Sequence, residues 1–132
     1  MDNIPKKLGA LARAQKLQER GAYLGYDFMS SDGVLSRLDD ELSELSRAGE
    51  NHDPEEIENE LGDVLFTVVN LARHLKVDAE ASLRKANRRF EQRVRRAESA
   101  AIDTGSRLQD ESVERLEERW SAAKAEERKD NL

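Results

Sequence analysis

Apolar residues recur every three or four positions along almost the whole of this 132-residue chain. Leu35, Leu38, Leu42 and Leu45, for example, step by 3, 4 and 3 positions. This spacing places such residues on one face of an α-helix. Only 2 prolines and 7 glycines interrupt the chain, which favours few turns and long elements. The pattern predicts an all-α protein with four or five helices.

Capping residues and polar segments predict where these helices begin and end. Asp53, Pro54 and the two glutamates after them form a strong helix start, because Asp accepts from free N–H groups and Pro fits the first turn. Asp78 is placed to cap the following helix. The length predicts a single domain over 1–132. Helices are expected over 8–17, 35–45, 57–75, 83–97 and 113–123, with a loop over 102–110 and a frayed polar tail over 126–132.

The segment 64–72 is apolar on almost every side of the predicted helix. A helix of this kind is normally buried all round, and a chain of this length offers few elements to cover it. We therefore expect a central helix that a second copy of the chain covers on one face, in a homodimer or a dimer of dimers. A well-buried central helix in a monomer is the alternative.

Charge and composition exclude several classes of function. The chain has 28 acidic and 22 basic residues, and a net charge of -6 does not suit a protein that binds duplex nucleic acid. Cysteine is absent, which excludes disulfides, thiolate metal sites and a cysteine nucleophile. The longest apolar stretch is too short to cross a bilayer. The composition predicts a protein of the cytoplasm with no membrane partner.

Two pairs of acidic residues flank the loop before Asp53. Glu41 and Glu44 lie on one predicted helix, and Glu60 and Asp63 lie on the next. An i, i+3 spacing puts both members of a pair on one face, about 4.5 Å apart along the axis. Residue 52 is the midpoint of both 44–60 and 41–63, so a hairpin at this loop brings the two pairs level. Four carboxylates are then expected to face one small volume.

Carboxylates at such short range repel each other unless a cation lies among them. An all-oxygen ligand set favours a hard cation, either Mg²⁺, Mn²⁺ or Ca²⁺. Ordinary exposed acids on two amphipathic helices are the alternative. Gly62 costs the helix about 1 kcal/mol relative to Ala, so we expect it to allow close helix packing or to leave room beside a metal.

Basic and aromatic residues supply the complement that a polyphosphate substrate needs. Arg89 and Arg93 share a helix face by their spacing, and Arg37 lies one turn before Glu41. Guanidinium groups beside a carboxylate-bound metal can neutralise phosphate oxygens. A solvated, acid-paired helix face is the alternative for the arginines. Trp120 and Phe28 each belong either to the core or to a surface on which a base stacks.

Several segments together resemble the MazG-type nucleoside triphosphate pyrophosphohydrolases. Asp40, Glu41 and Glu44, followed by Glu60 and Asp63, resemble the family's Glu-Glu-x-x-Glu and Glu-x-x-Asp signature. The likeness covers about residues 8–125 and is greatest to the catalytic C-terminal domain of the two-domain bacterial members. Further matching segments are 13–18 (RAQKLQ), 25–28 (GYDF), 60–66 (ELGDVLF), 69–75 (VNLARHL) and 85–93 (KANRRFEQR).

The resemblance implies a MazG-like helical bundle that dimerises and hydrolyses nucleoside triphosphates to the monophosphate and pyrophosphate with Mg²⁺. Mn²⁺ is a possible substitute, and removal of excess or aberrant nucleotides is the implied role. Phe28 stands where the family has Trp, which bears on base selection. The implied metal-binding and catalytic residues are Glu41, Glu44, Glu60 and Asp63. The implied substrate-binding residues are Arg37, Lys85, Asn87, Arg89, Arg93, Trp120 and Phe28.

Two other functions are compatible with the sequence. A non-catalytic helical dimer acting as an adaptor would explain the charge content, but not Gly62 or the symmetry about residue 52. A nucleotide sensor would bind phosphates without turnover. Metal-dependent release of pyrophosphate distinguishes the enzyme from both.

Overall fold

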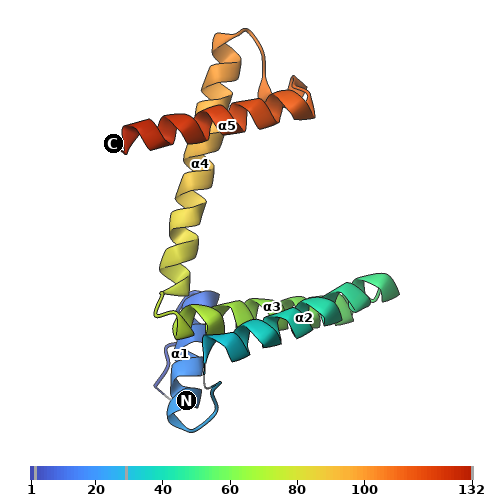
Figure 1. Ribbon diagram of the computed structural model, residues 1–132, viewed down its shortest axis with the longest axis vertical. Helices are drawn as coiled ribbons and strands as arrows, with labels where there is room; N and C mark the ends of the chain where they lie inside the picture. Colours follow the sequence, from blue (N-terminus) through green and yellow to red (C-terminus); the bar gives the residue numbers. More distant parts are fainter. Residues whose placement is uncertain (2, 29, 132) are drawn as a thin grey trace. The chain divides into compact units, whose positions relative to one another are not determined.

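A computed structural model describes residues 1, 3–28 and 30–131 of the chain. These residues form α-helices and one short 3₁₀ helix, with no strand among them, which confirms the predicted all-α class (Figure 1). The chain divides into two compact units, Met1–Ser82 and Leu83–Leu132, and each is described by itself. The elements are α1 (Ala10–Tyr23), α2 (Ser31–Asn51), α3 (Pro54–His74), α4 (Ala79–Asp103), η1 (Leu108–Asp110) and α5 (Val113–Asp130).

The first unit centres on a helical hairpin formed by α2 and α3, which lie side by side (Figure 1). Ser30 caps α2 by accepting from the N–H of Gly33, and Asp53 caps α3 by accepting from the N–H groups of Glu55 and Glu56. Pro54 occupies the first turn of α3, as the sequence predicts. His52 makes the reversal in a left-handed conformation, with φ at 55°. The short connection fixes the register between the two helices.

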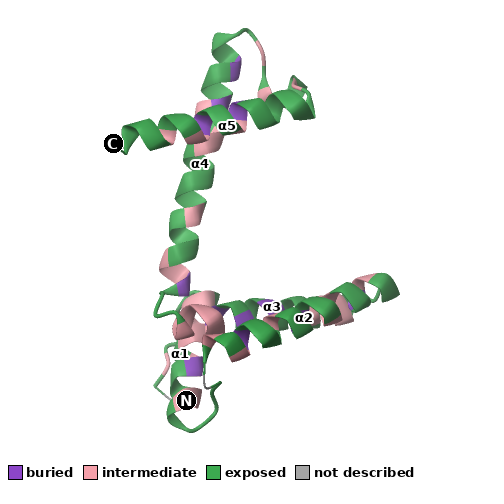
Figure 2. Cartoon of the chain, viewed as in Figure 1, coloured by how far each residue is buried: buried purple, intermediate pink, exposed green. Residues whose placement is uncertain are grey.

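Helix α1 packs against α3 through polar as well as apolar contacts. Gln18 Nε2 donates to the carbonyl oxygen of Phe66 at 2.8 Å. Gln15 Oε1 accepts from the N–H of Ala79 at 2.9 Å, at the start of α4. Burial in this unit is concentrated where α1, α2 and α3 meet (Figure 2). The buried apolar residues of the unit include Val34, Val64 and Val69, and Ala48 near the reversal between α2 and α3.

Helix α3 is not buried on all sides within the described chain, which argues against the alternative of a well-buried central helix in a monomer, and its coverage by a second copy stays a prediction. Val64 and Val69 are buried, whereas Leu65, Phe66 and Val68 are 44–51% exposed. Among the described residues, α1 and α2 are the helices that pack against α3, and together they leave part of its surface uncovered. The rest of the apolar surface of α3 stays accessible.

The second unit consists of most of α4 together with η1 and α5, which crosses α4 (Figure 1). Ala97, Ala101 and Ala123 are buried in this unit, and Figure 2 shows buried residues where α5 crosses α4. Arg119 is also buried, and its Nε donates to Glu111 Oε1 at 2.6 Å. Small side chains bring the two helices close, and the ion pair satisfies the buried guanidinium.

Helix α5 extends into the segment expected to fray, and the fraying itself stays a prediction. Helix α5 continues to Asp130, and Arg96 on α4 forms an ion pair with that residue. Leu132, the last residue of the predicted tail, lies outside the described residues. Over the described part of the chain, no helix combines the length and the hydropathy needed to span a membrane.

Candidate active site

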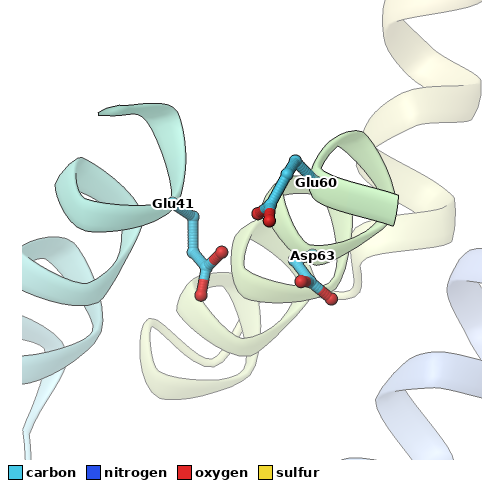
Figure 3. Close-up of side chains that lie close together, drawn as sticks. All are labelled: Glu41, Glu60 and Asp63. Carbon is cyan, nitrogen blue, oxygen red and sulfur yellow. The ribbon is translucent and has the colours of Figure 1, made fainter. Parts of the chain in front are cut away.

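The α2–α3 hairpin brings three of the four predicted carboxylates into one cluster. Glu41 on α2 points toward Glu60 and Asp63 on α3 (Figure 3). Each of the three offers an oxygen, and these oxygens all lie within 4.8 Å of one another. The spacing about residue 52 therefore predicts the juxtaposition correctly. The role of these residues as metal ligands stays a prediction.

Glu44 interacts electrostatically with this cluster and adds to the effect of burial in raising the pKa of Glu41 and Glu60. Burial is the main reason that the pKa of the Glu41 carboxyl is raised, and Arg37 opposes this shift. Burial also raises the pKa of Glu60, and the next largest contribution comes from the carboxyl of Glu44. Asp63 adds to the rise at both residues. All four predicted carboxylates therefore belong to one electrostatic group.

Two oxygens in the cluster are buried without a hydrogen-bond partner among the described residues. They are Oε2 of Glu41 and Oε2 of Glu60. The other oxygen of Glu41 is 2.7 Å from Arg37 Nη2. An unpaired buried carboxylate oxygen is costly in free energy, and a cation removes that cost. The donor set is all oxygen, so the residues fit a hard divalent cation such as Mg²⁺ or Mn²⁺.

A cavity of about 340 Å³ adjoins the cluster. Glu41 and Asp63 line it on the acidic side, and Arg37 lines it as well. Phe28, from the segment before α2, provides an aromatic wall. Arg37 and Phe28 are thus the two predicted substrate-binding residues that the first unit brings to the carboxylates.

The remaining predicted substrate-binding residues lie in the second unit. Lys85 and Arg89 line a cavity of about 520 Å³ in this unit. Arg93 Nε donates to Glu127 Oε2 at 2.8 Å, and its guanidinium lies over the Trp120 ring at 5.4 Å from the ring centre. The resulting hydrogen bond is the main reason that the pKa of Glu127 is lowered.

Asn87 is exposed on α4, in the same unit. Trp120 also packs against Phe90, with ring centres 5.9 Å apart. That these α4 and α5 residues meet the carboxylate cluster stays a prediction.

Gly62 does not mediate close helix packing within the described chain. A Cβ atom built at this position would meet nothing within 4 Å. Of the two reasons that the sequence suggests for this glycine, close helix packing is therefore excluded among the described residues. The other reason, room beside a metal, stays a prediction.

An ion-pair network at the end of α3 was not predicted from the sequence. Arg73 Nη1 donates to Asp27 Oδ2 at 3.0 Å, and His74 Nε2 lies 2.9 Å from Asp27 Oδ1. The hydrogen bond from Arg73 is the main reason that the pKa of Asp27 is lowered to about 2. No local pattern signals this contact, because 46 residues separate Asp27 from Arg73. The network ties the segment that carries Phe28 to the end of α3.

Fold and site together define a class: an all-α protein with a carboxylate cluster beside a cavity that also holds an arginine. Residues 29–97 match the model of the MazG nucleotide pyrophosphohydrolase domain. This match covers more than half of the chain, and the chain belongs to the MazG family. The resemblance seen in the sequence is therefore confirmed.

Relatives from several bacteria support this assignment. The chain is 41% identical over 115 residues to the nucleoside triphosphate pyrophosphohydrolase/pyrophosphatase MazG of Thermotoga maritima, covering 87% of this chain and 44% of that protein. It is 39% identical over 129 residues to the nucleoside triphosphate pyrophosphohydrolase of Escherichia coli K12, covering 96% and 49%. It is 35% identical over 133 residues to the uncharacterized protein YabN of Bacillus subtilis, covering 98% and 27%. The chain thus spans about half the length, or less, of these curated relatives.

Replacing Asp27 by Asn removes the charge that Arg73 and His74 share and keeps the size of the side chain. We expect Asp27→Asn to lower the free energy of unfolding at pH 7 by roughly 1 kcal/mol. A carboxylate whose pKa is lowered on folding stabilises the protein above its ordinary pKa of 3.8, and this stabilisation disappears as the pH falls toward about 2.

Urea denaturation of both proteins between pH 2 and pH 7 tests this expectation. Asp32→Asn, an exposed first-turn position of α2, is the control for loss of one acidic charge. A stability difference between Asp27→Asn and the parent that does not shrink between pH 4 and pH 2 would contradict the assigned ion pair.

Proposed function

We propose that this chain hydrolyses nucleoside triphosphates to the monophosphate and pyrophosphate, with a divalent metal ion and Mg²⁺ as the physiological ion. The observation that carries the proposal is the pair of buried, unpartnered carboxylate oxygens on Glu41 and Glu60, which lie beside a cavity in a MazG chain. The activities named for the Thermotoga maritima and Escherichia coli relatives support the reaction class. Removal of excess or aberrant nucleotides is the proposed role.

In this proposal the acidic residues bind the metal and the basic residues bind the phosphates. A metal held by Glu41, Glu44, Glu60 and Asp63 would supply Lewis-acid polarisation of the phosphate and a more acidic bound water. Arg37 lines the same cavity. Its exposed guanidinium can exchange its ion pair with Glu41 for one with a phosphate oxygen. Water adds to the α-phosphorus, the bond from that phosphorus to the bridging oxygen breaks, and pyrophosphate leaves. A carboxylate of the cluster accepts the proton of the water.

The second unit supplies the further contacts that the proposal needs. Arg89, Arg93 and Lys85 offer positive charge for the phosphate chain, with Asn87 in support. Arg93 is held by Glu127 in the described chain, so phosphate binding requires it to exchange that partner. Trp120 offers a face for the nucleotide. The proposed place of action is the cytoplasm.

Pyrophosphate release from a panel of nucleoside triphosphates tests the reaction. We expect release that depends on Mg²⁺, and a loss of about 100-fold or more in kcat/KM for Glu60→Ala, because that variant removes one ligand from the cluster. Glu58→Ala, an exposed position two residues earlier on α3, is the matched control and keeps activity.

Two results would contradict this reaction. Release of orthophosphate would place the cleavage at another bond. An absence of turnover, together with a melting temperature that Mg²⁺ leaves unchanged, would contradict the proposed metal site and favour the helical adaptor. Metal-dependent nucleotide binding without turnover would favour a sensor.

Gly62→Ala separates the stability of α3 from its chemistry. Nothing within 4 Å opposes the added methyl group, and Ala is the better helix former by about 1 kcal/mol. We expect a higher melting temperature, together with a lower kcat/KM where the open space at this position serves the metal site as the sequence suggests. Gly49→Ala, a helical position on α2 with equally open space, is the control and keeps activity. Full activity in Gly62→Ala would exclude a role for this space.

We also propose a homodimer, or a dimer of dimers, formed through the exposed apolar surface of α3. Leu61, Leu65 and Val68 are all 44–51% exposed on this helix. Burial of such surface between copies stabilises an assembly by about 25 cal/mol per Å² before the costs of association. No partner chain is needed to form the carboxylate cluster itself.

Sedimentation velocity at micromolar concentration tests the dimer. We expect the parent chain to sediment as a dimer or tetramer and Leu65→Lys to shift it to the monomer. Val113→Lys, at a more exposed position on α5, is the control for an added lysine. A parent chain that stays monomeric would contradict the proposal.

A further inference from the structure

A second cavity adjoins the one beside the carboxylates. It measures about 430 Å³ and is lined by Gln18, Tyr26, Asp27, Phe28, Phe66 and Asn70. Phe28, Phe66 and Asn70 line both cavities, so the two are neighbours that share a wall. The second cavity therefore lies beside a ligand whose phosphates occupy the carboxylate end.

Gln18 lines this cavity and carries a hydrogen-bond acceptor without a partner among the described residues. The residue is only 7% exposed, and its Nε2 donates to the carbonyl oxygen of Phe66 at 2.8 Å. That bond fixes the amide orientation, because a carbonyl oxygen can only accept. Gln18 Oε1 is buried and has no hydrogen-bond partner among the described residues. A buried acceptor without a partner is costly, and a ligand N–H would satisfy it.

Asn70 presents the complementary donor. Its Oδ1 accepts from Arg73 Nη2 at 2.7 Å, and Arg73 is itself held by Asp27. Since a guanidinium can only donate, this contact fixes which end of the amide is the oxygen. The Nδ2 group of Asn70 is then the end with donor capacity at the wall shared by the two cavities. The Asp27–Arg73–Asn70 chain therefore holds a donor in place.

We propose that this second cavity binds the base of the nucleotide through that pair of groups. Gln18 Oε1 accepts from an N–H of the base, and Asn70 Nδ2 donates to the neighbouring acceptor on the same edge. Phe28 and Phe66 supply apolar faces against which a base stacks. This inference rests on the proposed function, and it names Gln18 and Asn70 as base-binding residues of that site.

Substrate analogues that lack one group test each contact. ATP is compared with purine riboside triphosphate, which lacks the 6-amino donor, and CTP with its analogue lacking the 4-amino group. We expect the parent chain to lose about 10- to 100-fold in kcat/KM when the donor is removed, because Gln18 Oε1 is then left unpaired. In Gln18→Leu the two substrates of each pair should differ less than 3-fold.

Gln15→Leu is the matched control on the same helix. Gln15 bonds Val77 and Ala79 and does not line the cavity, so its loss lowers stability without changing the ratio between the two substrates. Asn70→Asp keeps an acceptor for Arg73 and removes the donor. The parent chain should discriminate against 1-deaza-ATP and 3-deaza-CTP, which lack the ring acceptor, and Asn70→Asp should not.

The outcomes separate the two proposals. Equal substrate ratios in the parent and in Gln18→Leu or Asn70→Asp, with turnover intact, overturn the base site and leave the reaction standing. An absence of pyrophosphate release from every triphosphate overturns the reaction instead. Circular dichroism checks the fold of each variant, and Asn70→Asp carries the test if Gln18→Leu does not fold. If the chain cleaves UTP but neither ATP nor CTP, UTP and its N3-methyl analogue, which lacks the donor, replace them.

Discussion

Burial of negative charge at Glu41 and Glu60 is the constraint on which the first unit depends. A hairpin with a two-residue reversal forces these carboxylates to face each other, and burial raises the pKa of both. Among the residues that the structure describes, Arg37 offsets the charge of Glu41 from nearby, through one oxygen. A fold that needed only stability would replace such residues with apolar ones, because unpaired buried charge costs several kcal/mol. The arrangement makes physical sense when a cation completes it.

The sequence predicts this part of the molecule well because its determinants are local. Asp53 and Pro54 fix the start of α3, and the short connection fixes the register of α2 against α3. Counting about residue 52 then gives the pairing of Glu41 with Asp63 without any tertiary information. The prediction that the elements are α-helices follows from the spacing of apolar residues, which is also local. The apolar period does not reveal which apolar residues the chain itself covers, so the structure is needed to identify Leu65 as exposed.

Other contacts depend on residues far apart in the sequence and have no local signal. Gln18 lies on an amphipathic helix like any surface glutamine, and only the packing of α1 on α3 buries it. Asp27 meets Arg73 across 46 residues, and no spacing rule relates a loop to the end of a helix two elements later. Gly62 shows the opposite case. The sequence correctly marks it as unusual, but only the structure excludes close packing as the reason.

The hydrogen-bond network of Asp27, Arg73 and Asn70 connects the stability of the fold with the selection of a ligand. Asp27 fixes Arg73, and Arg73 fixes the amide of Asn70, so the donor at the cavity wall is oriented before any ligand arrives. Orientation in advance lowers the entropy that binding must offset. The same aspartate directly precedes Phe28, which lines both cavities. The ion pair at the end of α3 thus positions both Phe28 and the amide of Asn70. Both residues also line the cavity that adjoins the carboxylates.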